Sequence, residues 1–490
     1  MKLAKLVRDA LGLRLSLPDT EVSRVVQDSR DLEPGVPSIF IARRGGALDG
    51  HRFVAQAVAQ GAVAIVGEAL PEEQRAFPWY YAVPYIYVPD DKAALAKLAA
   101  TFYGRPSKKL FCFGVTGTDG KTTTSHLLYH LLSPSYPTGL LSTAGIRIRD
   151  ASLTLPGHFT TPEAPVVQRL LAACLEAGCT HAVIESSSHG LAQRRLDEVD
   201  YDVGMWTNLS PEHLDFHGTL AAYRSAKAAL IARARVSVLN FDDPEYSYFA
   251  AQAARQVSYG LGEGATWRAV DVREGPGTLS WTLELRGKHQ ATLPMVGRYN
   301  VLNALAALAA ASEAGLSLGA LLRRLGTFPG VSGRMQVVQS RPFAVVVDFA
   351  HTAPALTKAL GALRPQVTGR LIVVVGAAGE RDPGKRAPLG EAALSHADLV
   401  IFTEEDSRSE EVEVILETMA AGAEGVGGVR DKTFWLLPDR REAIRRAVAL
   451  AGPGDLVLLA GKGHEGTLER RDETLVWNEV AEARAALAPG

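Results

Sequence analysis

The sequence predicts an α/β protein of three domains, and three observations carry this prediction. The chain has 490 residues, 47% of them hydrophobic, which suits about three domains of roughly 150 residues each. Short apolar runs of strand character alternate with helical stretches, as in units that build parallel sheets. Two clusters rich in glycine and proline, GRPS at 104–107 and FPGVSG at 328–333, interrupt this alternation. We therefore expect domains at residues 1–106, 107–331 and 332–490.

Each domain contributes its own strand signals. The first contains the runs SIFIA, AVAIV and YIYV among helical segments, which predicts a small α/β domain. The second opens with LFCFGVTG and a helical TTTSHLLYHLL, and continues with THAVIES, YDVGMWTNL and VSVLN. The third contains FAVVVDFAH, RLIVVVGAAG, ADLVIFTEED and GDLVLLAGKG, each ending in polar residues or glycine, which predicts a Rossmann-like sheet. Ligands of such sheets bind at the carboxyl ends of the strands.

Composition excludes several classes of protein. Formal net charge is -2, with 52 basic and 54 acidic residues, so no overall basic field would hold a nucleic acid. The three cysteines support neither a disulfide scaffold nor a zinc cluster. No apolar segment approaches the roughly 18 residues of a membrane span, and the N-terminus lacks the apolar core of an export signal. We expect a soluble cytoplasmic protein, a monomer, without membrane insertion.

The segment GVTGTDGKTTT at 114–124 is typical of a phosphate-binding loop in a P-loop ATPase-like central domain, although its glycine spacing differs from the usual pattern. A strand that ends in glycines and opens a helix directs backbone N–H groups and the helix dipole at one point, which suits a polyphosphate. Lys121 would reach the outer phosphates, and the hydroxyl of Thr122 would bind magnesium. The alternative is a purely structural turn between strand and helix.

Two further segments bring candidate metal ligands. Glu185 ends the strand in IESSSHGLAQRR, where its carboxylate can face the magnesium of the loop, and His213 lies in WTNLSPEHLDFHG. The alternative is that Glu185 caps a helix and that His213 is a surface histidine. Lys227, in AYRSAKAAL, reads by itself as a solvated helix residue.

The order TGTDGKTTT, ESSSHGL, TNLSPEHLDFHG and YRSAK resembles the ATP-dependent Mur ligases, the amide-forming enzymes of peptidoglycan precursor synthesis. Further along, GRYNVLNALAA, GVSGRM and VDFAHTAPAL are similar to the family's adenine-side segment, its domain junction and its VDYAHTPDAL motif. The marks QDSRDLEPG, Thr160-Thr161, GERDPGKR and GKGHEG are similar to the branch that adds the third peptide residue.

The resemblance implies a reaction and its partners. ATP phosphorylates the terminal carboxylate of UDP-N-acetylmuramoyl-L-Ala-D-Glu, and the amine of a diamino acid attacks the acyl phosphate. Lys121, Glu185, His213 and Lys227 are the implied catalytic residues, with Lys227 carbamylated to an anionic metal ligand. Two Mg²⁺ ions are implied, one at Thr122 and Glu185, the second at Glu185 and His213, with Lys227 completing the site.

The resemblance also implies three binding sets. ATP would contact Gly117, Thr118, Asp119, Gly120, Lys121, Thr122, Thr123, Asn300, Asn303, Arg334 and Asp348. The UDP-muramoyl dipeptide would contact Ser29, Arg30, Thr160, Thr161, Ser187, Gln193 and Arg195, with His51 as a further candidate. The incoming amino acid would contact Arg381, Asp406, Arg408, Gly461 and Glu465.

Two departures from the family pattern bear on specificity. Pro354 replaces an aspartate in VDFAHTAPAL. Members that add meso-diaminopimelate usually carry DNPR, whereas this chain has Glu405-Asp406-Ser407-Arg408. The extra negative charge of Asp406 would oppose a second substrate carboxylate, which favours L-lysine or L-ornithine over meso-diaminopimelate. The alternative is that Asp406 and Ser407 only cap the following helix. A folylpolyglutamate synthase-like ligase and a non-catalytic nucleotide-binding protein are the alternatives of other classes.

Overall fold

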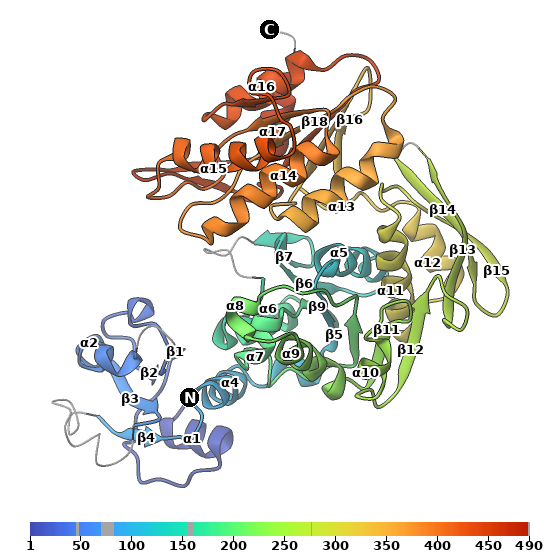
Figure 1. The fold of residues 1–490 in the computed structure, drawn as a ribbon. Helices are drawn as coiled ribbons and strands as arrows, with labels where there is room; N and C mark the ends of the chain where they lie inside the picture. The colour runs from blue at the N-terminus through green and yellow to red at the C-terminus, as the bar shows by residue number, and fades with distance from the viewer. Residues whose placement is uncertain (46–48, 70–82, 154–159, 276, 489–490) are drawn as a thin grey trace. The chain divides into compact units, whose positions relative to one another are not determined.

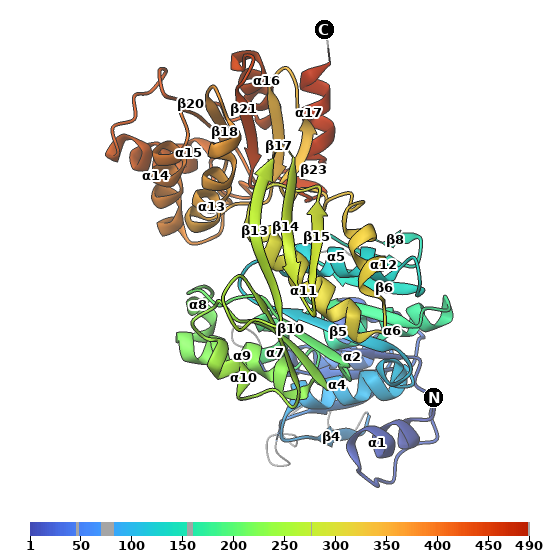
Figure 2. The same ribbon diagram turned by 90° about the vertical axis from the view of Figure 1, so that its right-hand side faces the viewer.

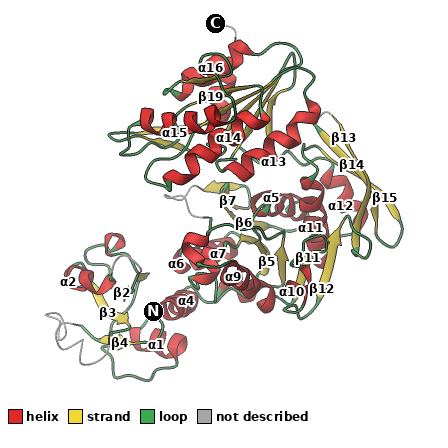
Figure 3. Ribbon diagram, viewed as in Figure 1, coloured by secondary structure: helices red, strands yellow, loops and turns green. Residues whose placement is uncertain are grey.

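The computed structural model describes residues 1–45, 49–69, 83–153, 160–275 and 277–488. The chain forms two compact units, which are described separately below. The first contains residues 1–267 and 305–321, and the second contains residues 268–304 and 322–490. Strands and helices alternate through both units (Figure 3), which confirms the predicted α/β class. The boundaries at residues 106 and 331 stay predictions.

The N-terminal part of the first unit is a parallel sheet of four strands in the order β1-β2-β3-β4. Its strands are β1 (Arg24–Val26), β2 (Ser38–Ala42), β3 (Ala62–Gly67) and β4 (Tyr85–Tyr87). Helices α1 (Leu3–Leu11) and α4 (Asp91–Phe102) pack their apolar side chains on one face, and α2 (Val54–Ala59) packs on the other. Asp90 accepts a hydrogen bond from Ala93 N and so caps the start of α4.

The rest of the first unit contains the central sheet, with strand order β12-β11-β10-β5-β9-β6-β7-β8. The strands from β12 to β6 run parallel, and β7 and β8 are antiparallel additions. They are β5 (Phe111–Thr116), β6 (Thr138–Ser142), β7 (Gly145–Ile148), β8 (Ala151–Leu153), β9 (His181–Glu185), β10 (Val203–Trp206), β11 (Val236–Asn240) and β12 (Gln256–Gly260). Because β5 pairs with β9 on one side and β10 on the other, the loop after it opens at a point where the strand order reverses.

Helices of this region connect the parallel strands, as Figure 1 shows. They are α5 (Lys121–Leu132), α6 (Ala164–Glu176), α7 (Ser188–Ala192), α8 (Leu214–His217), α9 (Leu220–Arg233) and α10 (Tyr246–Ala250). One core packs Cys112, Ala182 and Ile184 of the sheet against Leu171 of α6 and Leu230 of α9. The carboxyl ends of β5 and β9 are therefore held rigidly side by side.

The second unit is built on a six-stranded sheet in the order β16-β17-β21-β18-β19-β20, in which only β16 is antiparallel. The strands are β16 (Gln336–Gln339), β17 (Ala344–Asp348), β18 (Leu371–Val375), β19 (Leu399–Phe402), β20 (Phe434–Leu436) and β21 (Leu456–Ala460). One face packs against α13 (Ala353–Leu363), α14 (Arg386–His396) and α15 (Val412–Gly425). The other packs against α16 (Arg440–Leu450) and α17 (Glu479–Leu487). This doubly covered parallel sheet agrees with the Rossmann-like prediction.

The remaining elements of the described chain include antiparallel strands and two α-helices. An antiparallel ladder joins β13 (Trp267–Gly275), β14 (Thr278–Glu284) and β15 (Lys288–Leu293), as Figure 2 shows. A two-stranded hairpin of β22 (Thr467–Glu469) and β23 (Thr474–Val476) follows β21. Two further α-helices of the described residues are α11 (Tyr299–Glu313) and α12 (Leu318–Leu325). Across the described ranges, no helix combines the length and apolarity needed to cross a membrane.

Candidate active site

The loop between β5 and α5 requires glycine at two positions. Gly120 lies at φ 81°, a left-handed conformation that most residues avoid, and α5 begins directly after it. Gly117 lies at φ 150°, and a Cβ there would come within 1.8 Å of Thr207 Oγ1. The loop is further fixed by hydrogen bonds from Thr118 N to Asn208 O and from Asp119 N to Asn208 Oδ1. The backbone thus turns tightly into a helix N-terminus, the geometry that binds phosphate.

Lys121, the first residue of α5, folds back over this loop. Its Nζ donates to Gly117 O at 3.1 Å and to Thr118 O at 2.8 Å. The ammonium therefore lies at the loop itself. It can bind a phosphate oxygen there if it exchanges its hydrogen bonds to the two backbone carbonyls for one to the phosphate.

Glu185 ends β9 beside the loop and is buried, with 2% of its surface exposed. Its Oε1 accepts from Thr122 Oγ1 at 2.9 Å, and its Oε2 accepts from Ser142 Oγ at 2.7 Å and from Thr143 N at 3.0 Å. Glu185 does not cap a helix, because α7 is capped by Ser187. A hydroxyl and a carboxylate in contact are oxygen ligands that Mg²⁺ prefers, so this pair fits the implied ion.

Lys227 lies in the middle of α9 with only 1% of its surface exposed, so the reading as a solvated helix residue is wrong. Its Nζ donates to Gly117 O at 2.6 Å and lies 4.4 Å from the centre of the Tyr223 ring. Burial lowers the pKa of Lys227 well below its ordinary value, and the charge of Lys121 lowers it further. A neutral amine is the form that can react with CO₂, so this environment suits a carbamate.

His213 precedes α8 and has a left-handed backbone, at φ 54°. Its ring lies edge-on to His189, with centroids 4.7 Å apart. The side chain of His213 is 45% exposed, as the alternative of a surface histidine expects. Partial desolvation, together with the charges of Lys121 and Lys227, lowers the pKa of His213 to about 4, which favours the neutral imidazole that can bind a metal. Within the described residues, no three His, Cys, Asp or Glu side chains form a group that could hold a metal ion. A second ion would therefore need a further anionic ligand, which a carbamate on Lys227 would supply.

Four residues of the predicted dipeptide set lie together beside Glu185. Thr161 Oγ1 donates to Glu185 O at 2.9 Å and accepts from Ser187 N at 2.9 Å. Arg195 donates to Thr161 O at 2.7 Å and to Gln193 Oε1 at 2.6 Å.

The remaining predicted substrate residues are spread more widely. Thr160 is half-buried next to Thr161, whereas Ser29 and Arg30 lie in the turn after β1, in the N-terminal part of the unit. Arg30 is exposed and paired with Asp28, so an ordinary turn remains an alternative there. His51 is buried between Asp49 and Tyr85.

Sequence reasoning missed three residues of this region. Ser142 and Thr143 hold Glu185, and Glu163 pairs with Arg195 at 2.7 Å. Glu163 could have been found from the sequence, because it lies only two residues after Thr161 of the predicted dipeptide set. Ser142 and Thr143 gave none, since they are ordinary residues at a strand end.

The predicted nucleotide residues of the second unit form their own group. Asn303 Nδ2 donates to Asn300 Oδ1 at 2.8 Å, and Asn300 Nδ2 donates to Val296 O at 2.7 Å. Arg334 stacks on Phe349, with its guanidinium carbon 4.5 Å from the ring centre. Asp348 accepts from Met335 N and Ala350 N, and burial raises its pKa although Arg334 opposes the shift.

Pro354 lies in the first turn of α13, where proline is well tolerated because that N–H needs no helical partner. The presence of proline at position 354 is therefore explained by its position in the first turn of α13.

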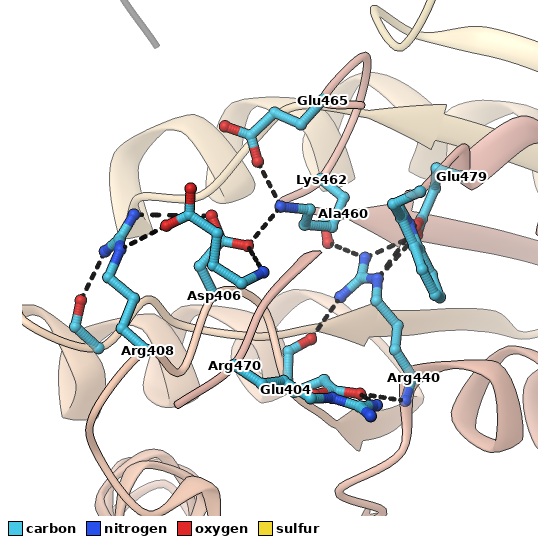
Figure 4. A network of polar contacts seen from close by, with 12 residues as sticks. Glu404, Asp406, Arg408, Arg440, Ala460, Lys462, Glu465, Arg470 and Glu479 are labelled. Carbon is cyan, nitrogen blue, oxygen red and sulfur yellow. Dashed lines mark hydrogen bonds and ion pairs between the residues drawn. The ribbon is translucent and has the colours of Figure 1, made fainter. Parts of the chain in front are cut away.

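The predicted amino-acid set lies at the carboxyl ends of β18, β19 and β21, and much of it belongs to one polar network (Figure 4). Arg408 donates to Glu469 Oε2 at 2.9 Å and to Gly379 O at 2.7 Å. Asp406 Oδ1 accepts from Lys462 Nζ at 2.8 Å, and the same ammonium donates to Glu465 Oε2 at 2.6 Å.

Two further positions complete this set. Gly461 lies at φ 103° against Glu405, whose Oε2 would be 3.0 Å from a Cβ there. Arg381 is exposed in the segment before α14. The alternative that Asp406 and Ser407 cap the next helix is wrong, because α15 begins at Val412 with Glu411 at its N-cap position.

Comparison with known proteins agrees with this architecture. Three family models match in chain order: "Mur ligase family, catalytic domain" at residues 21–103, "Mur ligase middle domain" at 115–311, and "Mur ligase, glutamate ligase domain" at 333–463. The chain belongs to the Mur ligase family, whose members are ATP-dependent ligases. It is thus an enzyme of the class that the sequence motifs indicated.

Within the family the chain is similar to the UDP-N-acetylmuramyl-tripeptide synthetases. One from Deinococcus radiodurans is 50% identical over 492 residues, which cover 98% of each chain. A UDP-N-acetylmuramoyl-L-alanyl-D-glutamate--2,6-diaminopimelate ligase from Geobacillus thermodenitrificans is 38% identical over 95% of each chain. A solved structure with the same ligase name is 31% identical, covers 99% of each chain and gives a TM-score of 0.68.

Proposed function

We propose that this ligase adds a diamino acid, as the third peptide residue, to UDP-N-acetylmuramoyl-L-alanyl-D-glutamate. Residues 1–106 would bind the UDP-muramoyl end, residues 107–331 would bind ATP, and residues 332–490 would bind the amino acid. The observation that carries the proposal is the buried amine of Lys227, 2.6 Å from Gly117 O of a phosphate-type loop whose neighbour Thr122 contacts Glu185. Because ATP and UDP-linked sugars are cytoplasmic metabolites, this activity implies a cytoplasmic enzyme.

The chemistry needs a leaving group on a carboxylate. Transfer of the ATP γ-phosphoryl group to the D-glutamate carboxylate gives an acyl phosphate and ADP. The amine then attacks the acyl carbon, a proton leaves, and phosphate departs as the amide forms. Negative charge gathers in both stages, so positioned cations and N–H donors contribute most. Lys121 would bind the transferred phosphoryl group, and the N–H groups of the loop would hold the remaining phosphates.

Magnesium would be held by Thr122 and Glu185, with His213 and carbamylated Lys227 at a second ion. These ions would supply neutralisation of the phosphate and carboxylate oxygens. Ser187 and Arg195 both contact Thr161 beside Glu185, which supports the assignment of these three residues to the dipeptide. Arg195 offers a planar guanidinium that can bind a carboxylate in two places.

For the amino acid, we favour L-lysine or L-ornithine. Glu405 is buried, and its Oε2 has no hydrogen-bond partner among the described residues. Asp406 and Glu465 at the same end of the sheet already share the ammonium of Lys462, so Glu405 is the carboxylate left to accept a substrate ammonium group. Meso-diaminopimelate is the second candidate, favoured by the names of the relatives that are 38% and 31% identical.

The test is ADP release that depends on UDP-N-acetylmuramoyl-L-alanyl-D-glutamate, measured with each amino acid in turn. We expect kcat/KM for L-lysine or L-ornithine to exceed that for meso-diaminopimelate by about tenfold, as one well-placed charge provides. A preference for meso-diaminopimelate would reverse the choice of amino acid and keep the ligase. ADP release without the UDP substrate, or with folate substrates alone, would contradict the proposal itself.

Lys227→Ala should lower kcat/KM by about a hundredfold or more, in the range seen when one positioned electrostatic group is removed. Short carboxylic acids such as acetate or formate should restore part of the activity, because they can take the place of the missing anionic ligand. The matched control is Lys97→Ala, an exposed lysine on α4, which should be unaffected with or without added acid. Full activity of Lys227→Ala, or the absence of any rescue, would count against the carbamate.

A further inference from the structure

Lys462 is a buried lysine held between two acidic residues of the candidate amino-acid site. None of its surface is exposed, and its Nζ lies 2.8 Å from Asp406 Oδ1 and 2.6 Å from Glu465 Oε2 (Figure 4). It follows the end of β21, between Gly461 at φ 103° and Gly463 at φ 50°. The chain therefore turns sharply on both sides of this one side chain and places its ammonium at the carboxyl end of the sheet.

The surrounding charges show what this ammonium does. Arg408 lies 3.6 Å from Asp406 Oδ2, but its Nε pairs with Glu469 at 2.9 Å. Glu405 and His351 also face this region. The charges of His351 and Lys462 lower the pKa of Glu405, and the charge of Glu465 raises it. Within this group Lys462 is the cation in direct contact with both Asp406 and Glu465. Without it, the buried carboxylate of Asp406 and the half-buried carboxylate of Glu465 would lose their shared counter-ion.

The protonation of Lys462 is consistent with that role. Burial by itself would lower the pKa of the ammonium, but Glu465 and Asp406 outweigh burial and raise the pKa above its ordinary value. The side chain thus carries its positive charge throughout the neutral range, and that charge loses its effect only when the pH rises through the raised pKa.

We propose that Lys462 is a specificity-determining residue, which sets the preference among diamino acids by balancing the charges of Asp406 and Glu465. The inference rests on the proposed function. The far end of L-lysine or L-ornithine carries an ammonium alone, with charge +1, whereas the far end of meso-diaminopimelate carries an ammonium and a carboxylate and is neutral overall. The charge balance of the site therefore separates these two substrate classes.

The same balance corrects the argument drawn from the sequence. The additional negative charge of Asp406 is compensated on the spot by Lys462, so Asp406 alone does not repel a second carboxylate. The preference among diamino acids therefore depends on Asp406 and Lys462 together. Removing the charge of Asp406 should shift this preference in one direction, and removing the charge of Lys462 should shift it in the other.

The experiment is a competition in which the full-length enzyme is given equal concentrations of L-lysine, L-ornithine and meso-diaminopimelate, and the tripeptide products are measured by mass spectrometry. Lys462→Met adds one net negative charge and should raise the ratio of lysine or ornithine product to diaminopimelate product by about tenfold. Asp406→Asn keeps the side-chain shape, adds one net positive charge, and should lower the ratio by about tenfold. A merely structural role would reduce all products together.

The double variant Lys462→Met/Asp406→Asn restores the net charge and should return the ratio to within about threefold of the wild-type value, since the two effects oppose each other. If Lys462→Met alone folds poorly, the double variant can be compared with Asp406→Asn to test the same charge balance. Lys432→Met, which removes an exposed positive charge of the same domain, should leave the ratio unchanged. Ratios of both single variants within twofold of wild type would overturn the inference. If the wild-type enzyme forms no tripeptide with any of the three, the proposed function fails instead.

Discussion

Lys121→Ala is expected to lower kcat/KM by about 10³-fold, because removing one preorganised stabiliser of developing phosphate charge costs that much in comparable sites. The expectation follows from the position of Nζ, which lies within 3.1 Å of two carbonyls of the loop and so stands where the phosphates would bind. Alanine keeps the helix N-terminus and the glycine turn, so we expect the loop to fold as before. The measurement is the rate of ADP release in the presence of the UDP substrate, which reports the formation of the acyl phosphate.

The matched control is Lys109→Ala, an exposed lysine just before β5, which should retain wild-type activity. Thermal unfolding of the two variants should agree closely with that of the wild type, because a partly exposed ammonium bonded to backbone carbonyls contributes little to stability. Turnover of Lys121→Ala within tenfold of wild type would contradict the assignment of the loop to ATP.

The sequence predicted those parts of the site that depend on local chain geometry. The loop at 114–124 needs glycine at positions 117 and 120 for its own backbone, and the structure has both at positive φ. Glu185 was placed at the end of a strand by the apolar run before it, and it contacts Thr122 because the carboxyl ends of parallel strands meet at one edge. Motif order then identified the family.

The parts that depend on distant segments could not be predicted. Lys227 lies in a helix without an apolar stripe, so its burial follows only from how α9 packs on the sheet. The pairing of Asp406 with Lys462 joins residues 56 positions apart, and it reversed the reading of the charge on Asp406. Likewise, nothing in VWNEVAE marked Glu479 as the partner of Arg440. In each case the decisive interaction joins segments that are far apart in the sequence.

Arg440 and Glu479 form a buried ion pair whose loss should produce the largest stability effect in the second unit. Neither side chain exposes any surface, and Arg440 Nη2 lies 2.6 Å from Glu479 Oε1. The same guanidinium donates to Glu404 O at 3.0 Å and to Ala460 O at 2.7 Å, and so fastens the ends of β19 and β21, where the amino-acid set lies (Figure 4). Trp477 Nε1 donates to Glu479 at 2.6 Å.

Arg440→Met should lower the free energy of unfolding by about 3–5 kcal/mol, because Glu479 would be left as an uncompensated buried charge. Arg440→Met/Glu479→Met removes both charges and should recover much of that loss, since apolar replacement of a whole buried pair is often close to neutral. The control is Arg441→Met. Arg441 is partly exposed, contacts Glu482 at 3.0 Å and lies 5.2 Å from the centre of the Trp477 ring, and losing these contacts should cost only about 1 kcal/mol. Because the chain has two units, hydrogen exchange of the β19 and β21 amides is the appropriate measurement. Equal exchange in Arg440→Met and Arg441→Met would show that the buried pair does not hold these strand ends, whereas selective loss of protection at β19 and β21 in Arg440→Met would show that it does.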